Sequence, residues 1–499
     1  MVENDNIKEL YARAKKAAEA VEFWSQERVD EVVAAVAWKW MSEEVGNEVA
    51  RIAAESSGMG NYEHKTMKAK KVRGCYLEMR DAKTAGIIRE DKDRKYITYG
   101  KPIGVVANVV PCTNPGITTK HIGLSLLKTR NACIVSPHPR TKLATYRVVQ
   151  WGRAVLKALN APEDLMLCIQ EPSNEKTVEL MQTCDFAVAT GGKALIKVVH
   201  AAGTPAITVG AGNVRTIIDP SADPKHVAYC VHKSKTFDNS TSCSSENAIS
   251  VHVDCWDAVM KELKAVGGHM LNDDEREKLK NALWPDGRTL NRDMVASHVQ
   301  NIAKHAGITV PENTAFLMVM GKEIGPSDPF SGEKLSLTLT VWKWSDFETE
   351  LKHLRKNLEY IGIGHSACIH SMKPEQWHRM AEFIPTGRIN VNAPNTKVNS
   401  GSWYAAQEFT TTLACGQWQG NSSTENINYK HFLQETRMCM PYTDWVSCDF
   451  REHIPTDEEV WGKRLKFVKE KITPIKLGIP FPKYEAHPNS KYYKFPHFD

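Results

Sequence analysis

Short runs of apolar, mostly β-branched residues alternate with helical segments along much of this chain, and that alternation restricts the fold more than any other feature. In the first half, the runs cover residues 103–110, 132–135, 165–169, 186–189, 206–209 and 216–218. Such runs are typical of strands buried on both faces, and the helices between them supply the crossovers that parallel strands need. We therefore predict a parallel, doubly wound α/β sheet.

The flanking residues add two further parts. Residues 6–92 have helical periodicity, for example at Ile7, Leu10 and Ala14, and predict an all-helical lead-in. After residue 247 a second alternation predicts another α/β domain, with strands at 248–253, 316–320, 335–341, 367–369 and 389–392 and helices at 256–266, 293–305 and 346–360. The glycine-rich residues 210–215 mark the expected boundary, and the Asn- and Ser-rich residues 390–402 are typical of a return linker.

The length and charge of the chain exclude several classes of protein. Its 499 residues are about three times the ~150 residues usual for one domain, so two or three domains are expected. The net charge of +5 is small for this length, and the basic runs are short, the densest being Lys68 to Arg73. We therefore expect neither nucleic acid nor a membrane as a partner.

Two further absences narrow the setting. The apolar stretch 103–111 is far shorter than the ~20 residues of a membrane span, and the first residues lack the basic flank and apolar region of a signal peptide. We expect a cytoplasmic protein. The twelve cysteines form no Cys-x-x-Cys pair, so we expect reduced thiols with no disulfide framework and no metal site.

Cys243 lies in a polar, turn-forming segment, residues 234–247, between an expected helix and the strand that begins at residue 248. An exposed thiol in such a loop can act as a nucleophile, whereas a cysteine elsewhere is more often a small core residue. The polar neighbours distinguish Cys243 from the other cysteines, most of which lie in apolar runs.

This segment, Ser-Lys-Thr-Phe-Asp-Asn-Ser-Thr-Ser-Cys-Ser-Ser-Glu-Asn, strongly resembles the active-site segment of CoA-acylating aldehyde dehydrogenases. Other segments resemble the same family in the same order, at 111–115, 128–132, 136–140, 189–192, 209–213, 333–336, 362–365 and 413–421. The resemblance covers roughly residues 5 to 435. The family that this chain resembles includes enzymes that act on succinate semialdehyde, sulfoacetaldehyde and acetaldehyde.

The resemblance implies an aldehyde dehydrogenase-like α/β fold in three parts. Residues 1–215 would form a doubly wound cofactor-binding domain, with an arm strand near 95–100, and residues 216–400 a second α/β domain that carries the catalytic cysteine. Residues 401–499 would return to the cofactor domain and form the rest of a small oligomerisation arm and a C-terminal tail. We expect the arm strands near 95–100 and within 388–440. Since the arm and tail have little core of their own, we expect a homodimer or homotetramer.

The family chemistry assigns two catalytic residues. The Cys243 thiolate would add to the aldehyde, a hydride would pass to NAD or NADP, and coenzyme A would take the acyl group from the thioester. By resemblance, the Asn114 amide and the backbone N–H of Cys243 would face the oxygen of the adduct. Without the resemblance, Asn114 would be interpreted as a turn residue before Pro115.

The cofactor residues rest on two kinds of observation. Thr190, Gly191 and Gly192 follow an expected strand and open a helix, where free N–H groups can face a pyrophosphate, although a plain strand-to-helix turn is the alternative. The Gly-x-Gly-x-x-Gly fingerprint is absent. The resemblance adds ribose and phosphate contacts at Ser136, Pro137, His138, Arg140, Gly210 and Glu333. Arg140 is equally well interpreted as a surface residue, and Glu333, expected to head a strand, as a solvated carboxylate.

Three other positions refine the chemistry. His365 either assists CoA binding or proton transfer, or is a structural histidine. Cys415 lies in a Gly-rich turn, and we interpret it as packing. The register of the resemblance places Val209 where hydrolytic aldehyde dehydrogenases have a water-activating glutamate, and this favours CoA as the acceptor, because a thiol needs less activation than water.

The aldehyde is predicted from the residues beside the nucleophile. Ser240, Thr241 and Ser242 offer hydroxyls that suit an anionic group, and Lys120 and His121 could add positive charge, unless the hydroxyls bond only their own loop and the basic side chains face solvent. Sulfoacetaldehyde and succinate semialdehyde are the leading substrates. The alternatives are acetaldehyde or glycolaldehyde, an acid-forming dehydrogenase, and a catalytically idle structural protein.

Overall fold

The structure is a computed structural model and describes residues 5–440 and 456–472. Five helices come first: α1 (Ile7–Val21), α2 (Gln26–Trp40), α3 (Glu43–Ser57), α4 (Tyr62–Lys70) and α5 (Val72–Arg80). The side chains of Asn6, Ser25, Ser42 and Asn61 cap the first four by accepting a backbone N–H. The helical lead-in is confirmed as far as Arg80.

The prediction of helix up to residue 92 is wrong at its end. Gly86 has φ +66°, and the residues that follow form strand β1 (Gly86–Asp91), which pairs antiparallel with β2 (Tyr96–Pro102). A left-handed glycine ends the helical path without strain, and pairing with a partner strand then decides the local structure.

The first sheet contains five parallel strands in the order β5-β4-β3-β6-β7. Every residue of β3 and β4 is buried, as expected for strands covered on both faces. The predicted parallel, doubly wound sheet is confirmed. Its strands are β3 (Val105–Val109), β4 (Ala132–Ser136), β5 (Met166–Cys168), β6 (Phe186–Thr190) and β7 (Ala206–Val209), and its helices are α6 (Pro115–Lys128), α7 (Lys142–Ala158), α8 (Asn174–Thr183) and α9 (Lys193–Ala201).

The second sheet has seven strands in the order β10-β11-β12-β9-β8-β13-β14, all paired in parallel. Its strands are β8 (Val214–Ile218), β9 (Glu246–His252), β10 (Gly268–Met270), β11 (Phe316–Met320), β12 (Thr338–Trp344), β13 (Ala367–His370) and β14 (Ile389–Val391). Its helices are α10 (Pro224–Lys235), α11 (Trp256–Ala265), α12 (Asp273–Leu283), α13 (Val299–His305), α14 (Phe347–Tyr360) and α15 (Pro374–Phe383).

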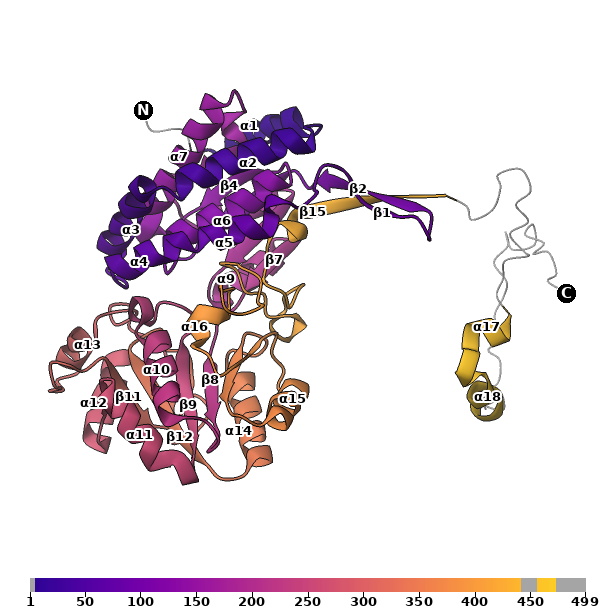
Figure 1. The fold of residues 1–499 in the computed structure, drawn as a ribbon. Helices are drawn as coiled ribbons and strands as arrows, with labels where there is room; N and C mark the ends of the chain where they lie inside the picture. Colours follow the sequence, from indigo (N-terminus) through magenta and orange to yellow (C-terminus); the bar gives the residue numbers. More distant parts are fainter. Residues whose placement is uncertain (1–4, 441–455, 473–499) are drawn as a thin grey trace, which may run out of the picture. The chain divides into compact units, whose positions relative to one another are not determined.

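Four details of this second sheet and its helices differ from the sequence prediction. The helix expected from residue 293 begins at Val299, and the strand expected from residue 335 begins at Thr338. Strand β10 was not predicted, because three residues carry too little periodicity to stand out. The predicted domain boundary after residue 215 lies inside β8, whose residues all belong to the second sheet. Figure 1 shows the two sheets with their helices as two lobes, with α16 (Asn395–Val398) and nearby loops between them.

A third sheet combines β1, β2 and β15 (Leu433–Cys439), with β2 in the centre. The arm strand predicted near 95–100 is β2. The expectation of arm strands throughout 388–440 is too broad, because β14 belongs to the seven-stranded sheet and β15 begins only at Leu433. The residues of β15 from Gln434 to Cys439 are exposed.

The chain divides into two compact units. The first contains residues 1–92 and 96–438 and holds both large sheets; the second contains residues 93–95 and 439–499. In the second unit, α17 (Asp457–Trp461) begins with a capping box at Thr456, and α18 (Leu465–Phe467) follows. The Pro- and Tyr-rich tail at 475–484 lies outside the described residues. Among the helices of the described part, none is long and apolar enough to cross a membrane.

Candidate active site

The Cys243 loop is an unusual stretch of backbone. After α10 the chain makes a 3-10 turn, and Asp238, Asn239 and Ser240 have consecutive φ values of 50°, 51° and 64°. Left-handed conformations are unfavourable for residues other than glycine and persist where surrounding contacts hold them. The loop ends at β9, which leaves the Cys243 side chain half-buried at the wall of a cavity.

His365 contacts the Cys243 thiol directly. Its Nε2 atom lies 3.1 Å from Cys243 Sγ, and its Nδ1 atom lies 2.8 Å from Ser366 Oγ. Desolvation, with a smaller effect of Arg388, lowers the pKa of His365 to about 3, so the imidazole is neutral. Desolvation and the Glu333 carboxylate raise the pKa of Cys243 to about 12. A protonated thiol therefore lies within hydrogen-bonding distance of a neutral imidazole.

The cavity beside Cys243 has a volume of about 310 Å³. Four lysines line it, Lys68, Lys70, Lys71 and Lys397, and no Asp or Glu is among its lining residues in the described part of the chain. Aromatic side chains supply much of the remaining wall: Phe237, Trp403, Tyr404 and Phe409. The cavity thus combines an apolar body with positive charge and no carboxylate.

Two of these lysines contact other residues of the cavity wall. Lys71 Nζ donates a hydrogen bond to Ser400 Oγ, and Lys397 Nζ lies 3.1 Å from the centroid of the Phe237 ring. Desolvation lowers the pKa of each lysine to about 8. Sequence reasoning noted the basic run that contains Lys71 but did not assign it to a site, and the i, i+3 spacing of Lys65 and Lys68 in α4 was the signal it could have used.

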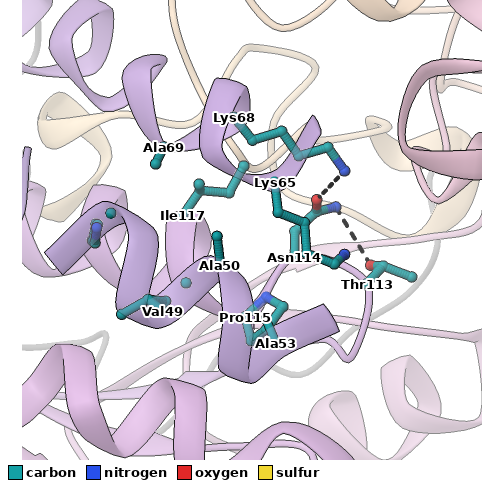
Figure 2. A pocket seen from close by; sticks show the side chains of 13 residues that line it. Val49, Ala50, Ala53, Lys65, Lys68, Ala69, Thr113, Asn114, Pro115 and Ile117 are labelled. Carbon is teal, nitrogen blue, oxygen red and sulfur yellow. Dashed lines mark hydrogen bonds between the residues drawn. The ribbon is translucent and has the colours of Figure 1, made fainter. Parts of the chain in front are cut away.

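Asn114 lies in the same cavity, immediately before α6. Its Oδ1 atom accepts a hydrogen bond of 2.8 Å from Lys68 Nζ (Figure 2). Pro115 occupies the first turn of α6, where its lack of an N–H does no harm, and so fixes the chain direction after Asn114. The fold therefore brings together the two residues predicted to be catalytic, Asn114 and Cys243.

The structure contradicts the interpretation of Lys120 and His121 as positive groups facing the aldehyde. Lys120 is 1% exposed, donates to the Trp40 carbonyl at 2.7 Å, and borders a separate cavity of about 30 Å³ beside Asn114. His121 is fully buried, and desolvation lowers its pKa to about 3, so it carries no charge. Both residues lie on the buried helix α6, which has apolar neighbours on almost every side.

The three hydroxyls before Cys243 do not act as a group. Ser240 Oγ donates to Ser245 Oγ at 2.7 Å, and Thr241 Oγ1 donates to Asp238 Oδ2 at 2.7 Å, so both satisfy their own loop. Neither residue lines the cavity, whereas Ser242 does. The prediction is corrected for Ser240 and Thr241, because the left-handed turn directs them into the protein.

Gly210 and Glu333 lie on the other side of Cys243. Glu333 Oε1 accepts from the N–H of Gly212 at 3.2 Å, and a Cβ on Gly212 would lie 2.4 Å from the Cys243 carbonyl oxygen. A Cβ on Gly210 would lie 1.8 Å from Gln419 Oε1. Desolvation raises the pKa of Glu333 to about 8. Contrary to the prediction, Glu333 does not head a strand, because β12 begins five residues later at Thr338.

The remaining predicted cofactor residues follow β4 and β6, the two neighbours of the central strand β3. Ser136 ends β4, Pro137 and His138 follow it, and Thr190 ends β6 before Gly191 and Gly192. Gly192 is the exposed N-cap of α9, and a Cβ there would meet nothing within 4 Å. This edge of a parallel sheet, with an open helix N-terminus, fits a dinucleotide.

Two of these residues also have protein partners. Ser136 Oγ lies 2.8 Å from Thr177 Oγ1, which leaves its second lone pair for a ligand. Arg140 is exposed and pairs with Asp293 at 3.6 Å, in agreement with the surface interpretation as well as with a reach toward phosphate.

Comparison with known proteins places this geometry in a family. The model of the aldehyde dehydrogenase family matches residues 1–305. The sulfoacetaldehyde dehydrogenase of Acholeplasma sp is 38% identical over 92% of this chain and 94% of its own length, and the acylating sulfoacetaldehyde dehydrogenase of Bilophila wadsworthia is 37% identical over 91% and 98%. The acetylating succinate-semialdehyde dehydrogenase of Clostridium kluyveri is 34% identical over 92% and 99%.

The chain belongs to the acylating aldehyde dehydrogenases. Among solved structures, an acetylating aldehyde dehydrogenase from Geobacillus thermoglucosidasius superposes with a TM-score of 0.85 at 32% identity, over 89% of this chain and 98% of that one. The family assignment from the sequence motifs and the predicted fold class are confirmed.

Val209 and Cys415 are both buried in this aldehyde dehydrogenase. Val209 is the buried last residue of β7 and does not line the Cys243 cavity. Cys415 is fully buried, with its Sγ atom 3.5 Å from the Leu413 carbonyl. No cysteine in the part of the chain that the structure describes forms a disulfide.

One group of potential metal ligands lies outside the cavity lining. The ligand atoms of His226, Cys230 and His370 lie within 4.8 Å of one another, but His226 Nε2 already lies 2.9 Å from the Asn392 carbonyl. The expectation that this chain has no metal site stays a prediction.

Proposed function

We propose that this enzyme oxidises a small anionic aldehyde to its acyl-CoA with NAD or NADP, through a thioester on Cys243. The observation that carries the proposal is the cavity beside Cys243, which four lysines line without any carboxylate among its lining residues in the described chain. Lysine is a compact cation with three donors, and it suits a carboxylate or sulfonate. The names of the relatives from Acholeplasma, Bilophila and Clostridium agree with such substrates.

The first step uses the contact between Cys243 and His365. As the thiol adds to the aldehyde carbon, its proton passes to His365 Nε2, 3.1 Å away, and a C–S bond forms. Ser366 Oγ lies against Nδ1 and fixes the ring so that Nε2 faces the sulfur.

The second step needs negative charge on the aldehyde oxygen. The Asn114 amide and the Cys243 N–H supply donors for that oxygen, and two such donors stabilise the charge from which a hydride can leave. Bound NAD or NADP would supply the acceptor for this hydride. The residues predicted to hold the cofactor lie after β4 and β6 and on the far side of Cys243, with Arg140 near a phosphate. They are Ser136, Pro137, His138, Thr190, Gly191, Gly192, Gly210 and Glu333.

CoA is the proposed acyl acceptor. By the register of the resemblance, Val209 stands where hydrolytic relatives have a water-activating glutamate, and the cavity lining contains no carboxylate that could replace it among the described residues. A thiol attacks the Cys243 thioester without such a base, and exchange between two thioesters is nearly balanced in energy. The reaction therefore runs in either direction as concentrations dictate.

A panel of aldehydes tests the substrate. We expect kcat/KM for sulfoacetaldehyde or succinate semialdehyde to exceed that for acetaldehyde and propanal by at least about tenfold, with CoA present and each cofactor tried in turn. A preference for the uncharged aldehydes would contradict the anionic substrate. Rapid mixing without CoA should give at most one reduced cofactor per active site, whereas sustained turnover would establish an acid-forming dehydrogenase.

A homodimer or homotetramer is proposed from β15. This strand lies at the edge of its sheet, and its residues from Gln434 onward are exposed, so its backbone is open to pairing with a second copy. Light scattering at micromolar concentration should give at least twice 56.0 kDa. A mass of one chain would contradict this proposal and leave the reaction untouched.

A further inference from the structure

We propose that Lys68, held by Asp238, is a positioning residue that fixes the Asn114 amide relative to Cys243. The inference rests on the proposed role of Asn114 in binding the aldehyde oxygen. It assigns a task to a buried charge pair that neither the family chemistry nor the cofactor contacts described above use.

All three N–H groups of the Lys68 ammonium are in use. Lys68 Nζ donates to Asn114 Oδ1 at 2.8 Å, to Asp238 Oδ2 at 2.6 Å and to Thr241 Oγ1 at 2.8 Å. The residue is 8% exposed. An ammonium with every donor occupied has none left for a substrate carboxylate or sulfonate, and this separates Lys68 from Lys71 and Lys397.

The contact with Lys68 determines how the Asn114 amide is turned. A lysine ammonium donates and never accepts, so the amide oxygen must face it and the NH₂ group must point elsewhere. In the structure, Asn114 Nδ2 has only a weak contact of 3.5 Å, to Thr113 Oγ1 (Figure 2). The two N–H groups of the amide are thereby left available for the aldehyde oxygen. The positive charge of the Lys68 ammonium, next to the amide oxygen, strengthens them as donors.

Asp238 ties the same ammonium to the nucleophile loop. Its carboxylate also accepts from Lys65 Nζ at 3.2 Å and from the N–H of Asn61 at 2.9 Å, and a Cβ on Gly60 would lie 1.9 Å from Asp238 Oδ1. These contacts come from α4 and the residues before it. They hold Asp238 at a positive φ, at the start of the left-handed turn that leads to Cys243.

Lys68 therefore bonds to both segments that supply the proposed oxyanion donors. Asn114 precedes α6 in the first lobe, and Cys243 follows the left-handed turn in the second. Since an oxyanion hole works only when its donors are about 3 Å from one oxygen position, a group bonded to both segments sets the separation that matters. A displacement of Asn114 by about 1 Å is enough to lose much of the rate.

The test compares Asn114→Ala, Lys68→Met and the double variant. Asn114→Ala should lower the rate of hydride transfer about 100- to 1,000-fold. We expect Lys68→Met to lower it about 10- to 100-fold, for propanal as much as for an anionic aldehyde, with KM changed less than about threefold. If Lys68 acts through Asn114, the double variant should be no more than about threefold slower than Asn114→Ala alone.

The control is Lys128→Met, which removes another buried lysine, paired with Asp30 and far along α6 from Asn114. It should lower the thermal midpoint without lowering the rate of hydride transfer. If Lys68→Met fails to fold, Asp238→Asn tests the same link, because it removes the carboxylate that holds the ammonium, and the same non-additivity with Asn114→Ala is expected.

Four outcomes would overturn the inference. Losses that multiply in the double variant would show that Lys68 acts independently of Asn114. A loss confined to KM for anionic aldehydes would make Lys68 a substrate ligand. A normal rate for Lys68→Met beside a slow Asn114→Ala would reject the inference alone, whereas a normal rate for Asn114→Ala would reject the proposed oxyanion role with it.

Discussion

The two walls of the Cys243 cavity differ in how the chain supplies them. The reacting wall consists of Phe237 and residues 242–244, with His365 behind the Cys243 thiol, and its nucleophile lies in one continuous polar segment. The lysine wall combines α4 and Lys71 with Lys397, residues separated by more than half of the chain and brought together only by the fold. The comparison teaches that a short segment can supply the proposed nucleophile, whereas the lysines proposed to select the aldehyde come from distant parts of the chain.

The largest effect should come from the reacting wall. Cys243→Ala removes the thiol proposed to form the thioester, so aldehyde oxidation should fall by at least about 1,000-fold. Binding of NAD(P)H, measured by fluorescence titration, should stay within about threefold, because the predicted cofactor residues lie on other segments. Turnover near the normal rate would reject the whole assignment.

Removing charge from the lysine wall should affect selectivity instead. In Lys71→Met/Lys397→Met, kcat/KM for the anionic aldehyde should fall about 100-fold, since one charged hydrogen bond is worth about 1.5–3 kcal/mol. The value for propanal should change less than about threefold. Steady-state kinetics with both aldehydes measures the difference, and equal losses would remove the distinction between the walls.

A matched control is Lys352→Met/Lys356→Met. Both lysines are exposed on α14 and do not line the cavity, yet the variant changes net charge by the same amount. It should leave both kcat/KM values within about twofold. A loss for the anionic aldehyde here would point to the overall charge of the protein rather than to the lysine wall.

The pH dependence of KM should separate the walls by a smaller amount. Desolvation lowers the pKa of Lys71 and Lys397 from 10.5 to about 8, and a lysine is charged below its pKa and neutral above it. As the pH rises from 7 to 9, KM for the anionic aldehyde should therefore increase, about three- to tenfold. KM for propanal should stay flat, and Lys71→Met/Lys397→Met should lose the dependence.

Much of the fold could be predicted because strands buried on both faces form continuous apolar runs in the sequence. Every residue of β3 and β4 is buried, and their apolar runs contain no competing helical pattern. The errors have physical causes. β1 has exposed residues and depends on pairing with β2, and the three residues of β10 are too short to show a period.

The candidate site, like the fold, could be predicted only in part from the sequence. Cys243 and Asn114, which the motifs singled out, line the same cavity, and His365, which had a catalytic interpretation among its alternatives, contacts the Cys243 thiol. The directions of side chains could not be predicted, because they depend on backbone that only the fold determines. Lys120 turns toward the Trp40 carbonyl on a buried helix, whereas Lys68, which had no assigned role, reaches Asn114.

The smallest prediction concerns the hydroxyls where the two walls meet. Ser242 lines the cavity, and its Oγ atom accepts from the N–H of Ser244 at 3.2 Å, which leaves its proton to donate to an anionic group. Ser242→Ala should lower kcat/KM for the anionic aldehyde about two- to fivefold, since one neutral hydrogen bond contributes about 0.5–1.5 kcal/mol. Ser240 is the control, because it is 1% exposed and bonds to Ser245. Ser240→Ala should lower the free energy of unfolding by about 1 kcal/mol and leave KM unchanged, and a larger effect on KM from Ser240 than from Ser242 would return the inner hydroxyls to the substrate site.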